Sequence, residues 1–445
     1  MPFAIKGACP RGAEWQICER VRRYGSVMRV CVLGAGVIGL TTAYFLAKAG
    51  HRVTIVDRNG LPAQEASYAN GGQLSYSYVA PLAAPSVLPA LPKYLLRRDS
   101  PLRFHFRADL DQWRWSLNFL RACSAGASRR HTAELTSLAY LSRDVLQELL
   151  AAEEIDFDYS REGKLVIHRD ARSFAGARSL VDYQRELGAE QQVLDAEGCI
   201  ALEPALAGMR GRFVGGIYTP SEDAGDCQKF CTGLDNLLRD KYGVERLYHH
   251  RIGALKPEGA RIRAVLTDRG EIDSDLFVMT AGLSSRELMR GIGIRLPICA
   301  LKGYSLTVPV SAGTVAPRIS VTDSQYKIVY ARLGETVRIA AMVDIGAAHG
   351  AIDHGRLAVL KRQVAESFPR LGNLEDALPW AGQRPATAQG KPIIGSSSFD
   401  NLLLNVGHGA LGFTLACGSG KLIAELVEGG KASIPIDPFR LGTVQ

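Results

Sequence analysis

The sequence predicts an α/β fold, an α+β composite in which two domains are interleaved along the chain. Its 445 residues exceed the length at which a single hydrophobic core usually stops growing. Residues 28–56 alternate strand, glycine turn, helix and strand, and residues 402–427 repeat strand, glycine turn and helix near the other end. Residues 297–342 instead contain successive strands with alternating apolar side chains. We therefore expect distant segments to form one domain and the segments between them to form a second.

The individual elements follow from hydrophobic periodicity and turn residues. The first strand covers 28–33, the first helix 41–49 and the second strand 51–56, and Gly50 ends the helix as a C-terminal cap glycine. Further helices are expected over 110–153, 227–241, 358–368 and 414–427. Further strands are expected over 165–168, 216–219, 246–255, 264–267, 276–280 and 402–406.

The composition is that of an ordinary globular protein, with 22% charged, 47% apolar and 7% aromatic residues. The formal charge of +8 is spread thinly along the chain, so we expect no nucleic-acid partner. An anionic cofactor, an acidic substrate or an anionic membrane surface would suit this charge. The nine cysteines show no CxxC spacing, and Cys227 and Cys231 lack a second ligand cluster, so no metal site is predicted. Reduced thiols indicate a cytoplasmic location.

Two segments need separate interpretation. Residues 1–27 lack the apolar core and the cleavage site of a signal peptide, and we interpret them as a disordered lead-in or a translation-start artefact. Residues 79–92 form an apolar loop interrupted by prolines, and no stretch reaches the ~18–20 continuous apolar residues of a transmembrane helix. The loop can touch a membrane surface or form a wall of a substrate pocket. The basic residues that follow it are Lys93, Arg97, Arg98 and Arg103.

A G-x-G-x-x-G pattern, formed by Gly34, Gly36 and Gly39, lies between the first strand and the first helix. In a Rossmann-like unit these glycines permit the tight turn, the approach of a pyrophosphate and close helix packing, while the helix N-terminus attracts the phosphates. Asp57 ends the next strand, where it can accept hydrogen bonds from a ribose diol. The expected dinucleotide contacts are Val32, Leu33, Gly34, Ala35, Gly36, Val37, Ile38, Gly39, Asp57 and Arg58.

A second glycine-rich turn favours FAD over NAD as the dinucleotide. Residues 405–414 read NVGHGALGFT and precede a helix, whose N-terminus suits the pyrimidine edge of a reduced flavin. His408 lies inside this turn, either as a structural residue or beside the flavin. A third point of close approach follows the strand over 276–280. The expected contacts from these two segments are Ala281, Gly282, Gly407, Gly409, Leu411, Gly412 and Thr414.

Residues 67–73 read SYANGGQ and follow the second strand. They form either a surface turn or a polar segment that satisfies the edge of the flavin ring. On the second interpretation, Ser67, Asn70, Gly71 and Gly72 contact the cofactor.

The candidate catalytic residues are Arg384, Tyr304, Lys302 and His408. Arg384 precedes a proline and offers a planar fork that pairs with a carboxylate through two hydrogen bonds. Lys302 and Tyr304 flank Gly303 and form a second candidate pair, in which the tyrosine can shape or hydrogen-bond a pocket.

These motifs divide the chain into three parts. Residues 1–27 are the lead-in. The Rossmann-like FAD-binding domain comprises residues 28–85, 211–290 and 376–445. The mixed-sheet substrate domain comprises residues 86–210 and 291–375.

The chain resembles the FAD-dependent D-amino acid oxidase superfamily, and within it the bacterial D-amino acid dehydrogenase branch. The resemblance implies non-covalent FAD and oxidative deamination, with hydride transfer from the substrate Cα to the flavin and release of a 2-oxo acid and ammonia. It also implies D-alanine as substrate, a respiratory or quinone-type electron acceptor and peripheral association with the inner face of the bacterial inner membrane. Arg384 occupies the place of the arginine that holds the substrate carboxylate. The matching blocks are MRVCVLGAGVIGL, SYANGGQ, VAPLAAP, GDCQKF, LKGYSLT, YKI, GQRPATAQGKPIIG and NVGHGALGFTLACGSG.

The sequence departs from the family pattern at several positions. Leu82 and Phe413 stand where tryptophan is expected, and Tyr76 and Ser77 stand where Pro-Gly is usual. The segment ATAQGKP after Arg384 lacks the acid that often precedes the glycine. These changes bear on the pocket and leave the cofactor motifs intact.

Two alternatives stay open. The chain could be an amine oxidase that acts on sarcosine, glycine or proline-like substrates and reduces oxygen. It could also be a redox-inactive FAD-binding partner protein, although such a protein has no need of a carboxylate anchor.

Overall fold

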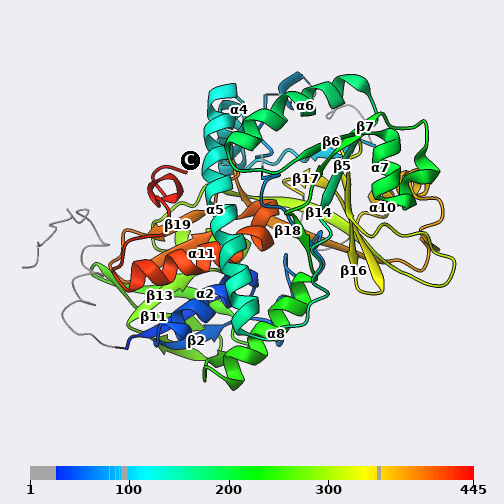
Figure 1. Cartoon of the computed structure of the whole chain (residues 1–445). Coiled ribbons are helices and arrows are strands. Elements are labelled where there is room, and N and C mark those ends of the chain that lie inside the picture. Colours follow the sequence, from blue (N-terminus) through cyan, green and yellow to red (C-terminus); the bar gives the residue numbers. More distant parts are fainter. Residues whose placement is uncertain are drawn as a thin grey trace, which may run out of the picture.

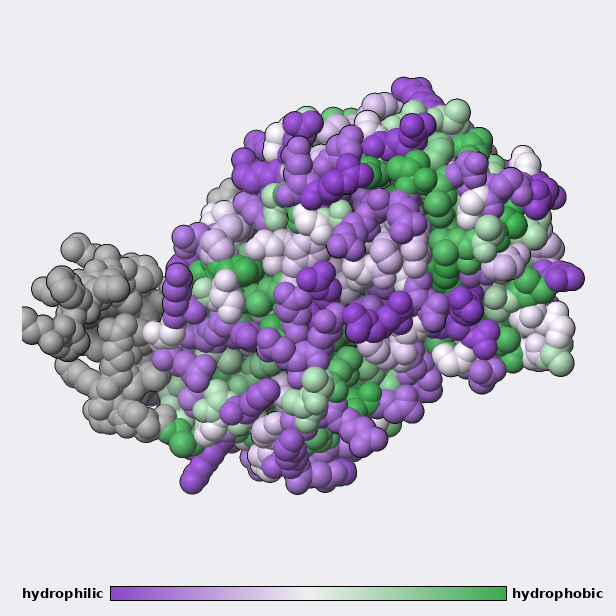
Figure 2. All heavy atoms as spheres, viewed as in Figure 1, coloured by the Kyte–Doolittle hydropathy of each residue, from purple (hydrophilic) through white to green (hydrophobic). Residues whose placement is uncertain are grey.

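The computed structural model describes residues 27–79, 81–85, 87–89, 91, 99–347 and 352–444 (Figure 1). The predicted lead-in lies outside the described residues apart from Val27. Lys93, Arg97, Arg98 and parts of the apolar loop over 79–92 also lie outside them. On the face shown in Figure 2, hydrophilic residues cover most of the described surface and hydrophobic residues form separate patches.

A six-stranded sheet joins distant parts of the chain. In spatial order its strands are β19 (Ile393–Ser396), β20 (Leu402–Val406), β13 (Leu276–Met279), β1 (Arg29–Leu33), β2 (Arg52–Val56) and β9 (Glu245–Leu247). All neighbours pair in parallel except β19 with β20. Apolar, β-branched runs such as RVCVL and RVTIV suit strands that are buried on both faces. Strands from the start, middle and end of the chain thus lie side by side, which confirms the interleaved α/β fold.

Helices cover one face of this sheet, and a small antiparallel sheet covers the other. Side chains alternate along β1, so that Val30 and Val32 face the helices while Cys31 and Leu33 face the small sheet. The helices are α2 (Val37–Lys48), α5 (Ala125–Ala152), α8 (Cys227–Asp240) and α11 (Gly412–Val427). The opposite layer contains β10 (Ile252–Glu258), β11 (Arg261–Thr267), β12 (Gly270–Asp273) and α9 (Ser285–Arg290).

A nine-stranded mixed sheet forms the second unit. Its main path runs β18 (Leu378–Thr387), β14 (Ile298–Pro309), β17 (Thr336–Ile345), β16 (Ile328–Leu333), β15 (Ser320–Asp323), β5 (Lys164–His168), β7 (Gly215–Thr219) and β6 (Gln192–Asp195), and β4 (Leu102–Phe104) pairs with β17. One face packs against α7 (Ala196–Leu202), η1 (Pro204–Met209) and α10 (His354–Ser367). The other described elements are β3 (Gln73–Leu74), α4 (Leu110–Ala122), α6 (Ala171–Glu186), β8 (Asp223–Ala224), η2 (Gly282–Ser284), η3 (Gly409–Leu411) and η4 (Asp437–Phe439).

The structure differs from the sequence prediction in several places. The helix expected over 110–153 is two helices, because Ser124 stops α4 and caps α5 by accepting a hydrogen bond from the backbone N–H of Ala127. The strand expected over 246–255 is divided into β9 and β10, with His249 between them at a φ of 57°. Strands β7 and β18 lie within segments assigned to the FAD-binding domain, yet they pair within the nine-stranded sheet.

Helix α11 is a core helix despite its apolar composition. Among the described residues, only the stretch Gly409–Val427 is long and apolar enough to cross a membrane, and 67% of it is buried inside the protein. It packs against α2, beside which it lies in Figure 1, and against α5. Gly420 permits this contact, because a Cβ there would lie 2.8 Å from the backbone carbon of Thr41. The apolar residues of α11 therefore serve the core.

Candidate active site

The turn after β1 is shaped by its glycines. Gly34 has a φ of 120°, and an ideal Cβ at Gly39 would lie 1.8 Å from the carbonyl oxygen of Gly34, so α2 packs directly on the turn. A Cβ at Gly36 would meet only Ser67 Oγ, at 3.6 Å. The open side of the turn is thus at Gly36, where the N-terminus of α2 offers its free backbone N–H groups. These residues fit the pyrophosphate of FAD.

Asp57 lies at the carboxyl edge of the sheet beside this turn. Its two carboxylate oxygens each accept one backbone N–H, from Ala35 and from Asn59, at 2.8 Å. The remaining lone pairs are oriented by these bonds and can accept ribose hydroxyls. The guanidinium of Arg58 forms an ion pair with Glu65 and lies 3.4 Å from Ser284 Oγ, so its contact with the cofactor stays a prediction.

Ala281 and Gly282 lie at the same edge, at the end of β13. A Cβ at Gly34 would lie 3.0 Å from the Cα of Ala281, and Gly282 has a φ of 55°. The Thr280 hydroxyl donates to the carbonyl of Leu33 at 2.9 Å and fixes the two turns together. Three segments expected to touch FAD therefore converge where parallel strands end, which is where ligands bind in such sheets.

The segment 67–73 connects the two sheets. Ser67 Oγ accepts a hydrogen bond from the backbone N–H of Val37 at the start of α2, at 3.2 Å. Farther along, the carbonyl of Ala69 accepts from Ser305 Oγ at 2.7 Å. The backbone carbonyl of Asn70 accepts from Arg338 at 3.0 Å. Asn70, Gly71 and Gly72 thus lie against the nine-stranded sheet, and a surface turn is excluded.

The turn before α11 reaches the same region from the end of the chain. Gly407 and Gly409 have φ values of 82° and 57°, and His408 bridges to Ala386 on β18. Thr414 lies in the first turn of α11, where its hydroxyl accepts the backbone N–H of Ser75 at 3.1 Å. The glycine turn, the helix N-terminus and the segment after residue 67 are therefore in contact.

The side chain of His408 is positioned to anchor the glycine turn to α11, and its catalytic role stays a prediction. Its side chain is buried, and Nε2 lies 3.0 Å from Ser419 Oγ inside α11. Burial lowers the pKa of His408 to about 3, so the imidazole is neutral at working pH. A neutral ring held against its own helix cannot supply positive charge, because protonation would bury an unpaired cation.

Arg384 is a half-buried cation without a counter-ion among the described residues. It lies on β18 opposite Leu301 of β14, and its guanidinium extends over Gly303. Among the residues that the structure describes, none forms a hydrogen bond or ion pair with it, and burial alone lowers its pKa. Because a cation that is partly removed from water and has no partner is costly, this site favours an anionic ligand such as a carboxylate.

Tyr304, of the second candidate pair, lies on the opposite face of β14 from the guanidinium of Arg384. Side chains alternate along β14, and Tyr304 lies on the face that packs against α10. Its hydroxyl donates to Asp344 at 2.9 Å, and Asp344 also pairs with Arg356 at 2.8 Å. Lys302 is buried, with its Nζ 5.8 Å from the Tyr304 ring centroid. The tyrosine is therefore a core residue.

Sequence reasoning missed Trp380, Gly382 and Lys164. Trp380, Gly382 and Arg384 follow one another at every second position of β18, so they share one face. This W-x-G-x-R spacing was the available signal. Lys164 is buried on β5, where its Nζ donates to Ser75 Oγ at 2.9 Å, and burial lowers its pKa to about 8. No local motif indicates Lys164, because its partners come from distant segments.

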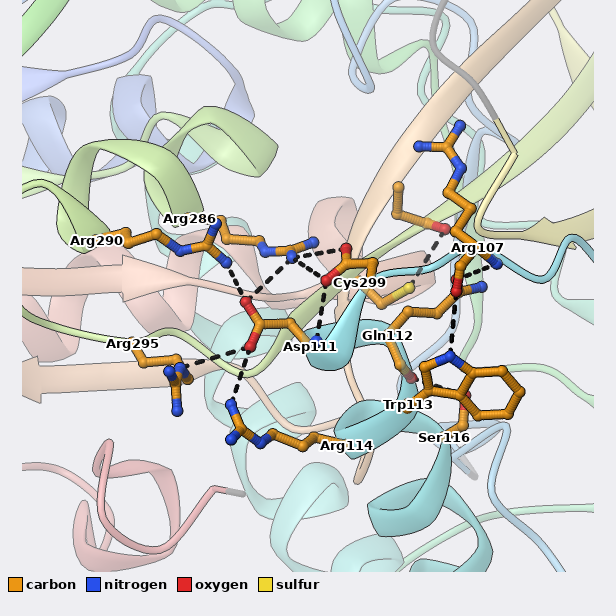
Figure 3. Close-up of polar contacts among 12 residues, drawn as sticks. Arg107, Asp111, Gln112, Trp113, Arg114, Ser116, Arg286, Arg290, Arg295 and Cys299 are labelled. Carbon is orange, nitrogen blue, oxygen red and sulfur yellow. Dashed lines mark hydrogen bonds and ion pairs between the residues drawn. The ribbon is translucent and has the colours of Figure 1, made fainter.

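Helix α4 borders the site with one face and is exposed on the other. Trp115 packs in a cluster with Leu301 and donates from Nε1 to the carbonyl of Ala386 at 2.9 Å. At the start of the helix, Asp111 is surrounded by arginines (Figure 3). These are Arg114, Arg286, Arg290 and Arg295. Because Arg286 and Arg290 belong to α9, this network ties α4 to the six-stranded unit.

The described residues contain no group of three His, Cys, Asp or Glu side chains that could hold a metal ion. All seven cysteines in the described part of the chain are buried and free.

Comparisons with known proteins identify the family of the chain. The family model described as FAD dependent oxidoreductase matches residues 29–426. A protein of Ralstonia nicotianae named D-amino acid dehydrogenase 2 is 46% identical, covering 93% of this chain and 100% of its own length. A protein of the same name from Pseudomonas aeruginosa is 48% identical, covering 90% of this chain and 94% of its own length.

Solved structures share the fold at low sequence identity. Glycine oxidase from Geobacillus kaustophilus superposes with a TM-score of 0.73 at 20% identity, covering 93% of this chain and 99% of its own. L-proline dehydrogenase from P. horikoshii gives a TM-score of 0.73 at 17% identity, covering 94% and 100%. At these identities the likeness concerns architecture alone.

Proposed function

The chain belongs to the family of FAD dependent oxidoreductases, and on that premise we propose that it oxidatively deaminates D-amino acids. The observation that carries this proposal is the half-buried guanidinium of Arg384, which has no counter-ion among the described residues. A substrate carboxylate would neutralise it through two parallel hydrogen bonds. The names of the relatives from Ralstonia nicotianae and Pseudomonas aeruginosa support a D-amino acid as substrate.

The residues of the chain act mainly by binding and orientation. The open turn at Gly36 and the carboxylate of Asp57 would hold the pyrophosphate and ribose, and the N-terminus of α11 would face the flavin. When bound, FAD supplies the acceptor for the hydride that leaves the substrate Cα. Arg384 fixes the carboxylate and therefore the direction of the Cα–H bond. Water then adds to the resulting imino acid and releases a 2-oxo acid and ammonia.

Anaerobic bleaching of bound FAD tests this function. We expect D-alanine to reduce the flavin and L-alanine to leave it oxidised, since the pocket is chiral. Arg384→Ala should raise KM by a factor of ~100 or more while FAD stays bound, because two charge-assisted hydrogen bonds to the substrate carboxylate are lost. Arg384→Lys keeps the positive charge but lacks the planar fork, so its KM should lie between those of the wild type and Arg384→Ala. Failure of every D-amino acid to bleach the wild-type flavin would overturn the proposal.

We further propose that the electrons pass to a quinone-type acceptor and that D-alanine is a preferred substrate. The dehydrogenase names of the relatives support this acceptor class, and the amine oxidase reading predicts oxygen instead. The yield of peroxide in air, measured against reduction of a soluble quinone, distinguishes the two. Peroxide in proportion to substrate consumed would favour the oxidase.

We propose that the outer face of α4 rests on an anionic membrane surface. Its apolar side chains lie at helical spacing and are exposed: Leu110 by 73%, Trp113 by 52%, Leu117 by 49% and Leu120 by 44%. Phe106 is 64% exposed and stacks on Trp113 with ring centroids 5.7 Å apart. Exposed arginines flank this stripe at positions 107, 114 and 121. Apolar residues beside cations suit the interface of an anionic bilayer.

Vesicle sedimentation tests this surface. Binding to vesicles that contain phosphatidylglycerol should fall when Trp113 and Leu117 are both changed to serine, and neutral vesicles should bind little. Leu180→Ser is the matched control, since Leu180 is 53% exposed on α6. Equal binding of both variants, or self-association through α4 in place of vesicle binding, would refute the proposal.

A further inference from the structure

Gly303 and Gly382 are direct cross-strand partners in the middle of β14 and β18. Neither has a positive φ, so a residue with a side chain could adopt either backbone conformation. A glycine in a strand interior weakens the strand and marks a place where something approaches closely. These two positions therefore require glycine because a side chain there would occupy space that other groups fill.

Two long side chains occupy that space. An ideal Cβ at Gly303 would lie 2.2 Å from Nη2 of Arg384, and one at Gly382 would lie 2.0 Å from Cη2 of Trp380. The guanidinium leans from position 384 toward one member of the glycine pair, and the indole leans from position 380 toward the other. Since Cβ positions of cross-strand partners are ~4.5–5.5 Å apart, the ends of both side chains lie close together.

The guanidinium of Arg384 and the indole of Trp380 thus lie side by side over the glycine pair. Trp380 is half-buried. A carboxylate held by Arg384 has its Cα one bond away, so the substrate side chain begins within reach of the indole. The indole favours contact with an apolar substrate side chain, and it occupies space that a larger side chain would need.

We propose that Trp380 sets side-chain specificity by limiting the size of the substrate side chain. The inference rests on the proposed function and adds to it a residue that selects small apolar D-amino acids. Arg384 binds every substrate through the shared carboxylate, whereas the indole meets only the part that differs between substrates.

The test compares kcat/KM for D-alanine and D-phenylalanine with an artificial dye as acceptor. Trp380→Leu and Trp380→Ala should raise the ratio of D-phenylalanine to D-alanine by ~10-fold or more, since a single methylene in an apolar pocket already changes discrimination 10–200-fold. Trp380→Phe keeps an aromatic ring of smaller size, and its ratio should be intermediate. Leu180→Ala on the exposed face of α6 is the control and should leave the ratio unchanged.

The two glycines provide a second, independent arm. Gly382→Ala should displace the indole and change the ratio. Gly303→Ala should displace the guanidinium and raise KM for both substrates by a similar factor, leaving the ratio unchanged. Binding of pyruvate and phenylpyruvate to the oxidised enzyme, followed by the flavin spectrum, measures the same discrimination without turnover.

The outcomes separate the two proposals. If no D-amino acid bleaches the wild-type flavin, the proposed function fails. If D-alanine bleaches it but the ratio is constant across the Trp380 and Gly382 variants, the specificity inference alone is overturned.

Discussion

The hydroxyl of Thr414 accepts the backbone N–H of Ser75 at 3.1 Å, so the first turn of α11 is fixed to the segment that follows β3. Thr414→Val keeps the shape of the side chain and leaves this buried N–H unpaired. The expected loss of stability is about 1–3 kcal/mol. Thermal unfolding and the temperature of FAD release measure the effect, and Thr414→Ser should behave like the wild type. Equal stability of the valine and serine variants would show that the hydrogen bond between Thr414 and Ser75 does not stabilise the protein.

Gly36 and Gly39 should respond differently to the same substitution. Gly36→Ala adds a methyl group that meets only Ser67 Oγ at 3.6 Å, so the fold should persist while FAD affinity falls. Gly39→Ala places a methyl group 1.8 Å from a backbone oxygen, so the fold itself should be destabilised. Unfolding temperature of the apoprotein and titration with FAD distinguish the two effects. Normal FAD affinity in Gly36→Ala would show that Gly36 does not contact the pyrophosphate.

His408 should make the protein less stable in acid. Burial lowers its pKa from 6.5 to about 3, so between these values the unfolded chain binds a proton that the folded chain does not. Stability is therefore complete above pH 6.5 and falls as the pH drops toward 3. At pH 5 the penalty is about 2 kcal/mol. The loss of unfolding temperature between pH 7 and pH 5 should be smaller in His408→Gln than in the wild type. Identical losses would show that His408 does not cause the loss of stability in acid.

The ion network at the start of α4 gives a further prediction. Burial alone would raise the pKa of Asp111, but the hydrogen bond from Arg286 and the nearby arginines lower it, so its contribution is present above pH 3.8 and lost as the pH falls. Asp111→Asn leaves these cations facing one another. We expect a loss of about 1–3 kcal/mol at neutral pH.

The control for this network is Asp182→Asn on α6. Its partner Arg185 is 63% exposed and Asp182 is 81% exposed, and such surface pairs contribute little. Denaturant unfolding at low and high salt compares the two variants. Similar losses in both would show that the network does not tie α4 to α9.

The cofactor end of the site could be predicted because its signals are local. Gly34, Gly36 and Gly39 occupy a turn whose geometry demands them, and a turn is formed by neighbours in sequence. The same holds for the glycines around His408. What the sequence does not show is the direction in which an embedded side chain points, as the imidazole of His408 illustrates.

The substrate end depends on strand register, which is set by distant pairings. Lys302 and Tyr304 flank a register shift between β14 and β17, so the face on which each lies does not follow from spacing alone. Trp380 and Gly303 come together only because β18 pairs with β14 in one register. Lys164 meets Ser75 across 89 residues of chain, and no sequence pattern marks such a contact.

The position of β20 inside the six-stranded sheet has a consequence for biosynthesis. During translation β1 emerges first. Its sheet neighbour β13 is complete only when residue 279 has been synthesised, and β20 only when residue 406 has been synthesised. The turn before α11 is synthesised later still. Long-range pairing of this kind folds slowly. The Gly34–Gly39 turn is therefore synthesised long before the turn over residues 407–412, and the site that both turns line cannot form until translation has passed residue 412.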